Sequence, residues 1–150
     1  MPNPFVANFH LEVTFGKPIA LTQFERLIDD LNFPGIYFLH DGQCSENDFD
    51  PLSIKVKYIG KAIGETIFSR CQKHLYTITD RKAANGNPKT NPGKRFKEYR
   101  EKIKFDPEGI YVVPGFMNHA EPYLISCAEE YLQFLYRQRH GDIPAANTKQ

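Results

Sequence analysis

Hydrophobic and polar positions change their period several times along the chain, and each change predicts an element. Residues 9–15 (FHLEVTF) alternate between apolar and polar side chains, as a strand with one buried face does. Residues 20–31 then take helical spacing, and Thr22 followed by Glu25 offers a capping box. We therefore expect this first segment to form a strand and then a helix.

Two further strands are predicted in the next part of the chain. Residues 35–39 (GIYFL) follow a helix-breaking Pro34 and form an apolar run, whereas residues 54–59 (IKVKYI) alternate. We expect these two strands to pair as an antiparallel hairpin. The segment between them (DGQCSENDFDPLS) is polar and rich in turn residues, which predicts a long, exposed connection.

The spacing of residues 64–76 predicts a helix with two neighbouring faces. Its apolar face consists of Ile67, Phe68, Cys71 and Leu75. Arg70 and His74 stand four residues apart beside that face, so their side chains can reach the same ligand.

The remaining elements are a loop, two helices and a strand. Glycine, proline and asparagine predict a loop over residues 79–93, followed by a short basic helix over 94–102. Residues 108–113 (EGIYVV) predict a third strand, and residues 123–139 a long helix that ends at Gly141. The whole pattern favours an α/β domain in which a small three-stranded antiparallel sheet is flanked by helices.

Composition places this pattern in one globular domain spanning residues 1–150. A chain of 150 residues with 41% hydrophobic content can bury one core. No segment approaches the roughly 20 apolar residues that a membrane helix needs, and the first residues lack the features of a signal peptide. We therefore expect a cytoplasmic protein without a membrane partner. The three cysteines lack the spacing of a zinc site and are interpreted as buried or idle thiols.

Charge is distributed unevenly although the net charge is only +1. Between residues 81 and 104, nine Lys and Arg side chains face only two Glu side chains. Such a cluster is typical of a solvated surface loop, or of a surface that contacts the phosphate backbone of a nucleic acid. The cluster alone does not decide between these two interpretations.

The order of several short motifs points to a family. GIY contains Tyr37, YIG on the adjoining strand contains Tyr58, Arg70 and His74 lie on the next helix, and a helical Glu precedes Pro-x-x-Asn at residues 144–147. This order resembles the GIY-YIG nuclease superfamily over residues 33–149, with residues 1–32 as an added strand and helix. The spacing is reminiscent of the restriction-enzyme branch. A second GIY contains Tyr111, which comes after YIG and is interpreted as a residue of the third strand.

The resemblance implies roles that phosphodiester hydrolysis requires. Tyr37 is expected to act as the general base, Tyr58 to position the water, and Arg70 to hold the scissile phosphate. His74 is expected to assist the proton network. A phenol whose unperturbed pKa is about 10 becomes a usable base only beside cations, and Arg70, Lys61 and His74 are the local candidates.

A metal ligand is expected on the last long helix, where Glu129 and Glu130 are adjacent. Helical periodicity sets Glu129 at the border of the apolar face and Glu130 near the opposite side, with Ser126. The resemblance also favours Glu129, with Glu130 as the alternative. One carboxylate with water and phosphate oxygens suits Mg²⁺, or Mn²⁺ in its place. Asn147 corresponds to the late Asn of the family, which would support the site by hydrogen bonding to backbone or phosphate.

These expectations together indicate an endonuclease that hydrolyses DNA by a one-metal mechanism, with a restriction-type role as one form of it. The cations expected to contact DNA are Lys61, Arg81, Lys82, Lys89, Lys94, Arg95, Lys97 and Arg100. Two alternatives stay open: a repair or structure-specific nuclease, and an inactive nucleic-acid-binding module on the same scaffold. The sequence also leaves open a homodimer or a protein partner.

Overall fold

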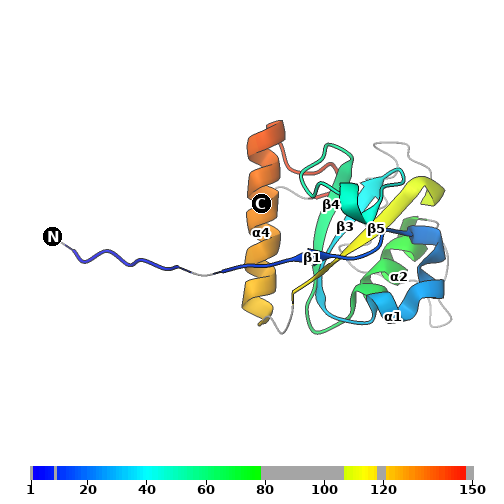
Figure 1. Cartoon of the computed structure of the whole chain (residues 1–150), viewed down its shortest axis with the longest axis horizontal. Coiled ribbons are helices and arrows are strands. Elements are labelled where there is room, and N and C mark those ends of the chain that lie inside the picture. The colour runs from blue at the N-terminus through cyan, green and yellow to red at the C-terminus, as the bar shows by residue number, and fades with distance from the viewer. Residues whose placement is uncertain (1, 9, 79–106, 118–120, 148–150) are drawn as a thin grey trace.

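The computed structural model describes residues 2–8, 10–78, 107–117 and 121–147. These residues form a mixed α/β fold around an antiparallel sheet whose strand order is β1-β5-β3-β4, with β2 also paired to β5 (Figure 1). The strands are β1 (Thr14–Phe15), β2 (Ile19–Ala20), β3 (Gly35–Asp41), β4 (Val56–Ala62) and β5 (Ile110–Phe116). The α-helices of the described residues are α1 (Ile28–Leu31), α2 (Ile67–Ile78) and α4 (Pro122–His140).

Strand β3 is the centre of the sheet, and its pairing confirms the predicted antiparallel hairpin with β4. Tyr37 lies opposite Gly60 of β4 on one side and opposite Pro114 of β5 on the other. The first six residues of β3 are all buried, because both faces of a central strand are covered. This burial explains why GIYFL is an apolar run rather than an alternating one.

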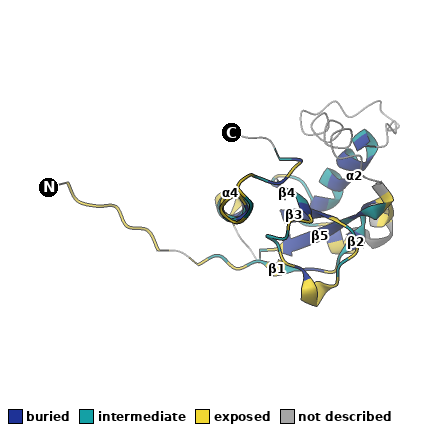
Figure 2. Cartoon of the chain, turned by 90° about the horizontal axis from the view of Figure 1, so that it is seen from above, coloured by how far each residue is buried: buried dark blue, intermediate teal, exposed yellow. Residues whose placement is uncertain are grey.

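The two faces of the sheet carry separate cores. Tyr37 and Leu39 belong to the core that includes Ile67, Cys71 and other residues of α2. Ile36 and Phe38 point the other way and pack in the core that includes residues of α4. Figure 2 shows α2 and α4 on opposite sides of the sheet. Successive strand residues alternate between faces, so the position of Tyr37 in β3 directs its side chain toward α2.

The outer edge of β4 is covered by the residues that follow α4. The amide of Ala146 donates to the carbonyl of Lys57 at 2.8 Å. Asn147 Oδ1 accepts from the amide of Ile59, and Asn147 Nδ2 donates to its carbonyl, both at 2.9 Å. Backbone groups of an edge strand need partners when they are shielded from water, and here one amide side chain pairs with both groups of one residue.

The first segment of the chain differs from its prediction. The strand expected over residues 9–15 is reduced to β1, and a second short strand, β2, joins the same edge of β5, so the sheet has five strands rather than four. Pro18 lies between the two strands and lacks the N–H that a continuous ladder would need. The amide of Gly16 still donates to the carbonyl of Pro114 at 2.9 Å.

The helical segment predicted over residues 20–31 is confirmed from residue 21, but its first part is a 3-10 helix. Ile19 and Ala20 pair with Val112 and Tyr111 of β5, so the helix begins only at Leu21 and runs as a 3-10 helix to Leu27 before α1. Thr22 is therefore an internal residue rather than the expected cap, and the capping-box prediction is wrong. Tyr111 lies on β5, as predicted.

The later elements follow the sequence closely where the structure describes them. Strand β5 and helix α4 confirm the third strand and the long helix, and Gly141 ends α4 in the left-handed conformation with φ 83°. The loop predicted over residues 79–93 and the basic helix predicted over 94–102 lie outside the described residues. In the described ranges no helix has the length and apolar character needed to cross a membrane.

Replacing Asn147 with Ala should destabilise the fold through the edge of β4. The change removes both hydrogen bonds to Ile59 and leaves partly buried backbone groups without those partners, a loss of roughly 1–3 kcal/mol in the free energy of unfolding. Urea denaturation of Asn147→Ala measures the loss. Ala145→Ser at a neighbouring exposed position is the control and should stay within about 0.5 kcal/mol of the parent. Equal stabilities for both variants would contradict the role given to Asn147.

Candidate active site

Three rings from three elements meet on the α2 side of the sheet. Tyr37 comes from β3, Tyr58 from β4 and His74 from α2. Their ring centroids are 5.9 Å apart for the two tyrosines, 5.7 Å for Tyr37 and His74, and 5.6 Å for Tyr58 and His74. Tyr37 Oη and His74 Nε2 are joined by a buried hydrogen bond of 2.5 Å. The structure therefore brings together three of the residues that the motif order selected.

Gly60 provides the room in which the two tyrosine rings lie. A Cβ at this position would fall 2.7 Å from Cζ of Tyr37 and closer still to Cε1 of Tyr58. Real Cβ atoms do not approach other heavy atoms so closely, and the rings belong to packed side chains. Close packing against Tyr37 and Tyr58 thus explains why YIG has a glycine at position 60. The position of this glycine, two residues after Tyr58, was the sequence signal for this packing.

Arg70 lies on α2 one turn before His74 and is largely buried, with 13% of its side chain exposed. Its guanidinium is 3.9 Å from the carboxylate of Glu65, which also pairs with Lys73 at 3.1 Å. The positive charge of Arg70 lowers the pKa of both Tyr37 and Tyr58 against larger opposing effects. Arg70 Nε is a buried donor that finds no acceptor among the described residues. Such a donor is suited to an incoming anion.

Burial dominates the protonation of the ring cluster. Desolvation raises the pKa of Tyr37 well above its usual value and also raises the pKa of Tyr58. The same burial, with the charge of Arg70 as a smaller cause, lowers the pKa of His74 well below its usual value. His74 is therefore neutral near pH 7, and the expectation that it supplies positive charge to the phenol is wrong. Arg70 is the cation that acts on Tyr37.

Glu129 lies where α4 meets the edge of the sheet and is 13% exposed, whereas Glu130 is exposed. Glu129 Oε1 is 3.7 Å from Lys61 Nζ, which also donates to Ser126 Oγ at 3.1 Å. Burial raises the pKa of the Glu129 carboxyl, and the nearby Lys61 charge lowers it. Ser126 thus lies on the Glu129 side of α4 rather than with Glu130, because residues three apart share a helical face.

The tyrosine cluster on the α2 side and the Lys61–Glu129 pair on the α4 side come close to each other at the edge strand β4. Tyr58 points toward α2, and Lys61 of the same strand reaches α4, where it contacts Ser126 and Glu129. The charge of Glu129 nevertheless acts on Tyr58, and that of Arg70 acts on Glu129. A strand at the edge of a sheet allows this approach, because no further strand separates the two faces there. The ammonium group of Lys61 therefore points toward the carboxylate of Glu129 and not toward the tyrosine rings.

The donors present fit a magnesium or manganese ion only as a one-carboxylate site. In the part of the chain that the structure describes, no group of three or more His, Cys, Asp or Glu side chains is placed to hold a metal. Glu129 offers a single carboxylate, and Mg²⁺ commonly uses one or two carboxylates together with water and substrate phosphates. Because Lys61 Nζ already lies near this carboxylate, a bound ion would replace or share that contact.

The remaining predicted site residues divide into two groups. Asn147 hydrogen-bonds to the backbone of Ile59, next to Tyr58. Of the two partners expected for Asn147, backbone or phosphate, the structure shows the backbone. The predicted DNA contacts Arg81, Lys82, Lys89, Lys94, Arg95, Lys97 and Arg100 lie outside the described residues. Glu65 was not identified from the sequence. This residue lies just before α2, and its carboxylate pairs with Arg70 and Lys73. Its only signal was a carboxylate five residues before Arg70.

Replacing Gly60 with Ala should force the tyrosine rings apart. The added methyl group cannot occupy its position without displacing Tyr37 or Tyr58, so we expect a loss of about 1–3 kcal/mol in the free energy of unfolding. Near-ultraviolet circular dichroism should also change, because the tyrosines change environment. Gly109→Ala is a matched control, since a Cβ there meets no atom within 4 Å. A Gly60→Ala variant that matches this control in both measurements would contradict the packing role.

The buried neutral His74 makes stability depend on pH in a defined direction. In the unfolded chain His74 titrates near pH 6.5, whereas in the native state its pKa lies well below that value. Below about pH 6.5 the unfolded state binds more protons, so the native state loses up to about 1.4 kcal/mol of stability per pH unit from this group. Urea denaturation between pH 7.5 and 5 should show a smaller decline in His74→Gln than in the parent. Parallel declines would contradict the neutral assignment.

Comparison with protein-family models, curated proteins and solved structures found no match to this chain. The resemblance to the GIY-YIG superfamily therefore depends on the order of the motifs. Geometry gives information about the chemistry of the site that does not depend on motif order. It comes from the arrangement of five side chains: Tyr37, Tyr58, Arg70, His74 and Glu129.

Proposed function

We propose that this protein is a divalent-metal-dependent DNA endonuclease of the GIY-YIG type. The observation that carries the proposal is one buried donor, Arg70 Nε, which has no acceptor among the described residues although the rest of the guanidinium hydrogen-bonds to Tyr37 and Tyr58. A packed core has no need for such an arrangement, because a buried donor without a partner costs free energy. A phosphate oxygen would satisfy it.

Arg70 is the proposed phosphate anchor. One terminal nitrogen of its guanidinium lies 3.9 Å from Glu65, the group also hydrogen-bonds to Tyr37 and Tyr58, and Nε lacks an acceptor in the described part of the chain. Guanidinium groups bind phosphate oxygens with paired hydrogen bonds, and the burial of Arg70 strengthens such contacts relative to those at a solvated surface. Arg70 would orient the phosphate beside the hydroxyls of Tyr37 and Tyr58.

Tyr37 and His74 form the proposed path for the proton. The hydroxyl of Tyr37 lies 2.5 Å from His74 Nε2, so a proton arriving at Tyr37 Oη has a neutral nitrogen beside it. Burial keeps the Tyr37 hydroxyl protonated in the free protein, since its pKa is raised well above the usual value. Tyr37 can therefore act as a base only by passing its own proton on, and His74 Nε2 is the acceptor within reach. Tyr58 would hold the water in position.

Glu129 is the proposed metal ligand. The chemistry that Mg²⁺ supplies in such a site is neutralisation of charge on the phosphate and on the leaving oxygen. The carboxylate of Glu129 is the largely buried one near Tyr58 and Arg70, whereas that of Glu130 is exposed. Lys61 supports this assignment, because burial raises the pKa of the Glu129 carboxyl and the ammonium beside it acts in the opposite direction, in favour of the charged form. Substrate binding would release Lys61 for a phosphate.

DNA is the proposed substrate because the sequence sets a run of Lys and Arg directly after α2. Cleavage of short duplex sequences, as in restriction enzymes, is the form we favour from the motif spacing. Cleavage of branched or damaged DNA is the alternative within the same chemistry. A binding module without catalysis is favoured by one observation, the complete burial of the Tyr37 side chain in the absence of substrate.

Supercoiled plasmid incubated with the protein and Mg²⁺ should be nicked or linearised, and EDTA should abolish the reaction. Glu129→Gln should reduce the cleavage rate by at least ~10²-fold, because it removes the carboxylate proposed to hold the metal. Glu130→Gln is the matched control and should remain within a few-fold of the parent. Tyr37→Phe should lose roughly 10²–10⁴-fold, as expected for a positioned proton-transfer group. Branched and single-stranded oligonucleotides tested in parallel identify the substrate class.

Tight DNA binding without cleavage in Mg²⁺ or Mn²⁺ would overturn the enzyme proposal and favour the binding module. Equal losses in Glu129→Gln and Glu130→Gln would contradict the assignment of the metal ligand while leaving the nuclease activity standing. Thermal unfolding of each variant separates loss of catalysis from loss of fold.

A further inference from the structure

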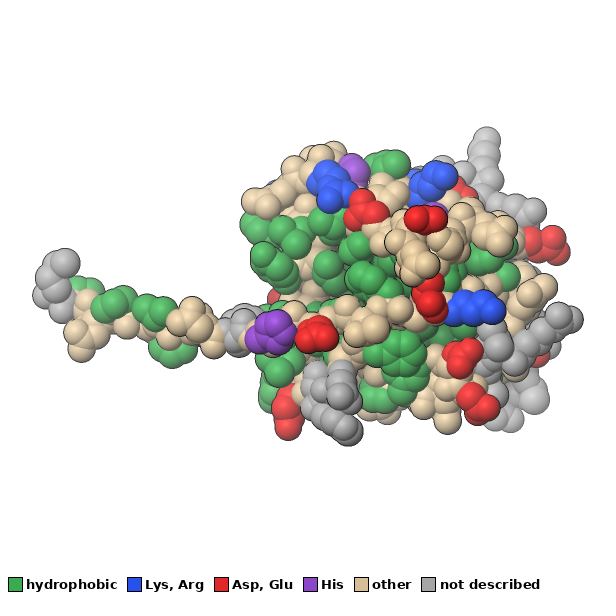
Figure 3. All heavy atoms as spheres, viewed as in Figure 1, with side chains coloured by type: hydrophobic (Ala, Val, Ile, Leu, Met, Phe, Trp, Pro, Cys, Tyr) green, Lys and Arg blue, Asp and Glu red, His purple; other side chains and the backbone are tan. Residues whose placement is uncertain are grey.

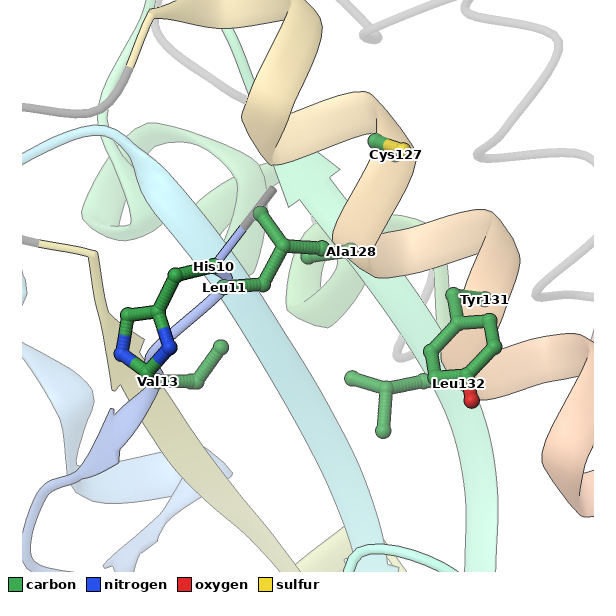
Figure 4. Close-up of a pocket in the computed structure, with 7 residues that line it drawn as sticks. All are labelled: His10, Leu11, Val13, Cys127, Ala128, Tyr131 and Leu132. Carbon is green, nitrogen blue, oxygen red and sulfur yellow. The ribbon is translucent and has the colours of Figure 1, made fainter. Parts of the chain in front are cut away.

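A pocket of about 610 Å³ lies between residues 10–13 and helix α4, away from the tyrosine cluster. Figure 4 shows Leu11 and Val13 on one side of it, with Ala128 and Leu132 extending from α4 on the other. Cys127 and Tyr131 lie on the α4 side of the same space. The lining is mainly apolar, which suits a hydrophobic occupant rather than a phosphate.

The segment that leads to this pocket is an apolar arm, residues 2–8. Phe5 is 93% exposed and Val6 is 71% exposed, so neither side chain packs on its own molecule. The sequence of residues 1–9 (MPNPFVANF) contains no charged side chain and no histidine. Figure 1 shows the arm extending away from the sheet and helices, past α4. Large exposed apolar side chains on an extended segment indicate a surface that is covered in another state.

Helix α4 presents a second exposed apolar surface beside the pocket. Tyr123, Tyr131 and Phe134 are 87%, 54% and 51% exposed, and the rings of Tyr131 and Phe134 stack with centroids 6.3 Å apart. Figure 3 shows hydrophobic side chains along the arm and over the part of the surface where α4 lies in Figure 1. Exposed apolar side chains are thus found both on the arm and on α4, where they lie beside the exposed charged side chains of Glu130 and Arg137.

We propose that this protein forms a homodimer in which the arm of each copy lies in the pocket and along the outer face of α4 of the other. The proposal goes beyond the nuclease activity and does not depend on it. In this dimer the occupant of each pocket is a second copy of the chain, and Phe5 and Val6 are the side chains that become buried.

The position of the arm favours exchange between two copies. The base of the arm, His10 to Val13, itself forms one wall of the pocket, so the arm leaves the molecule at the rim of the surface that its counterpart would occupy. Two-fold symmetry then places both arms at once, and each contact occurs twice. Seven extended residues span up to ~24 Å. The 19-residue helix α4 is about 28 Å long, so an arm of this length can follow most of its outer face.

The arm and the pocket also match in their lack of charged side chains. The arm brings no charged side chain to a pocket that is lined mainly by apolar side chains, with His10 at its rim, so its burial needs no ion pair to offset desolvation. Neither the arm nor the lining of the pocket carries a Lys or Arg side chain for a phosphate, which favours an apolar occupant of the pocket over a nucleic acid. Arg137 and Glu130 are exposed on α4 but do not line the pocket.

The full chain should sediment as a concentration-dependent dimer in analytical ultracentrifugation. A Phe5→Ser, Val6→Ser double variant should weaken the dimer by at least tenfold, because it removes the two apolar anchors. Asn3→Ser, on the same arm, is the control and should dimerise as the parent does. A parent chain that is monomeric at every concentration, or a double variant that dimerises as strongly as the parent, would overturn the proposal.

Cys127 provides a direct test of which copy the arm contacts. In a Cys44→Ser background, Val6→Cys should form a disulfide with Cys127 on air oxidation, and the product should run as a dimer on a non-reducing gel. Adding Cys127→Ser to this variant should remove that band. Peptide mapping of the product identifies the linked positions. A disulfide within one chain would show that the arm folds back on its own α4, and would overturn the exchange, as would the absence of any link between position 6 and Cys127.

Discussion

The close approach of two tyrosine rings over Gly60 is the constraint on which the site depends. Antiparallel pairing sets Tyr37 opposite Gly60, and the missing Cβ allows the Tyr37 ring to lie across β4 toward Tyr58. The same placement brings the Tyr37 hydroxyl to His74 on α2. The missing Cβ of Gly60 therefore allows the hydrogen bond between Tyr37 of the sheet and His74 of α2, the helix that also carries Arg70.

The place of β4 at the edge of the sheet explains how groups from both faces can cooperate. Tyr58 points toward α2, while Lys61 points toward α4 and pairs with Glu129. An edge strand normally leaves backbone groups exposed to water, yet here Asn147 and Ala146 pair with them. The residues after α4 thus hold in position the strand that carries Tyr58 and Gly60.

Sequence reasoning succeeded where local patterns and fixed pairing rules suffice. The alternation and apolar runs around Tyr37 and Tyr58 predicted their strands, and helical spacing placed Arg70 beside His74. The first segment was mispredicted in part, because pairing with distant β5 formed the unforeseen strand β2 and moved the start of the helix from Ala20 to Leu21. The protonation of His74 was also beyond sequence, since it follows from complete burial. Glu65 was missed because it lies in the turn before α2, where helical spacing gives no signal, and Ser126 was placed with Glu130 because its contact with Lys61 of β4 depends on tertiary packing.

The central claim is that the buried guanidinium of Arg70 holds a substrate phosphate. Lys73 provides a matched comparison, because it pairs with the same Glu65 carboxylate but is 35% exposed, against 13% for Arg70. The most direct measurement is single-turnover cleavage of plasmid DNA in Mg²⁺ by Arg70→Ala and Lys73→Ala, with folding checked by circular dichroism. The account predicts a loss of at least ~10²-fold for Arg70→Ala and a change of only a few-fold for Lys73→Ala. A folded Arg70→Ala variant that cleaves as fast as Lys73→Ala would contradict it.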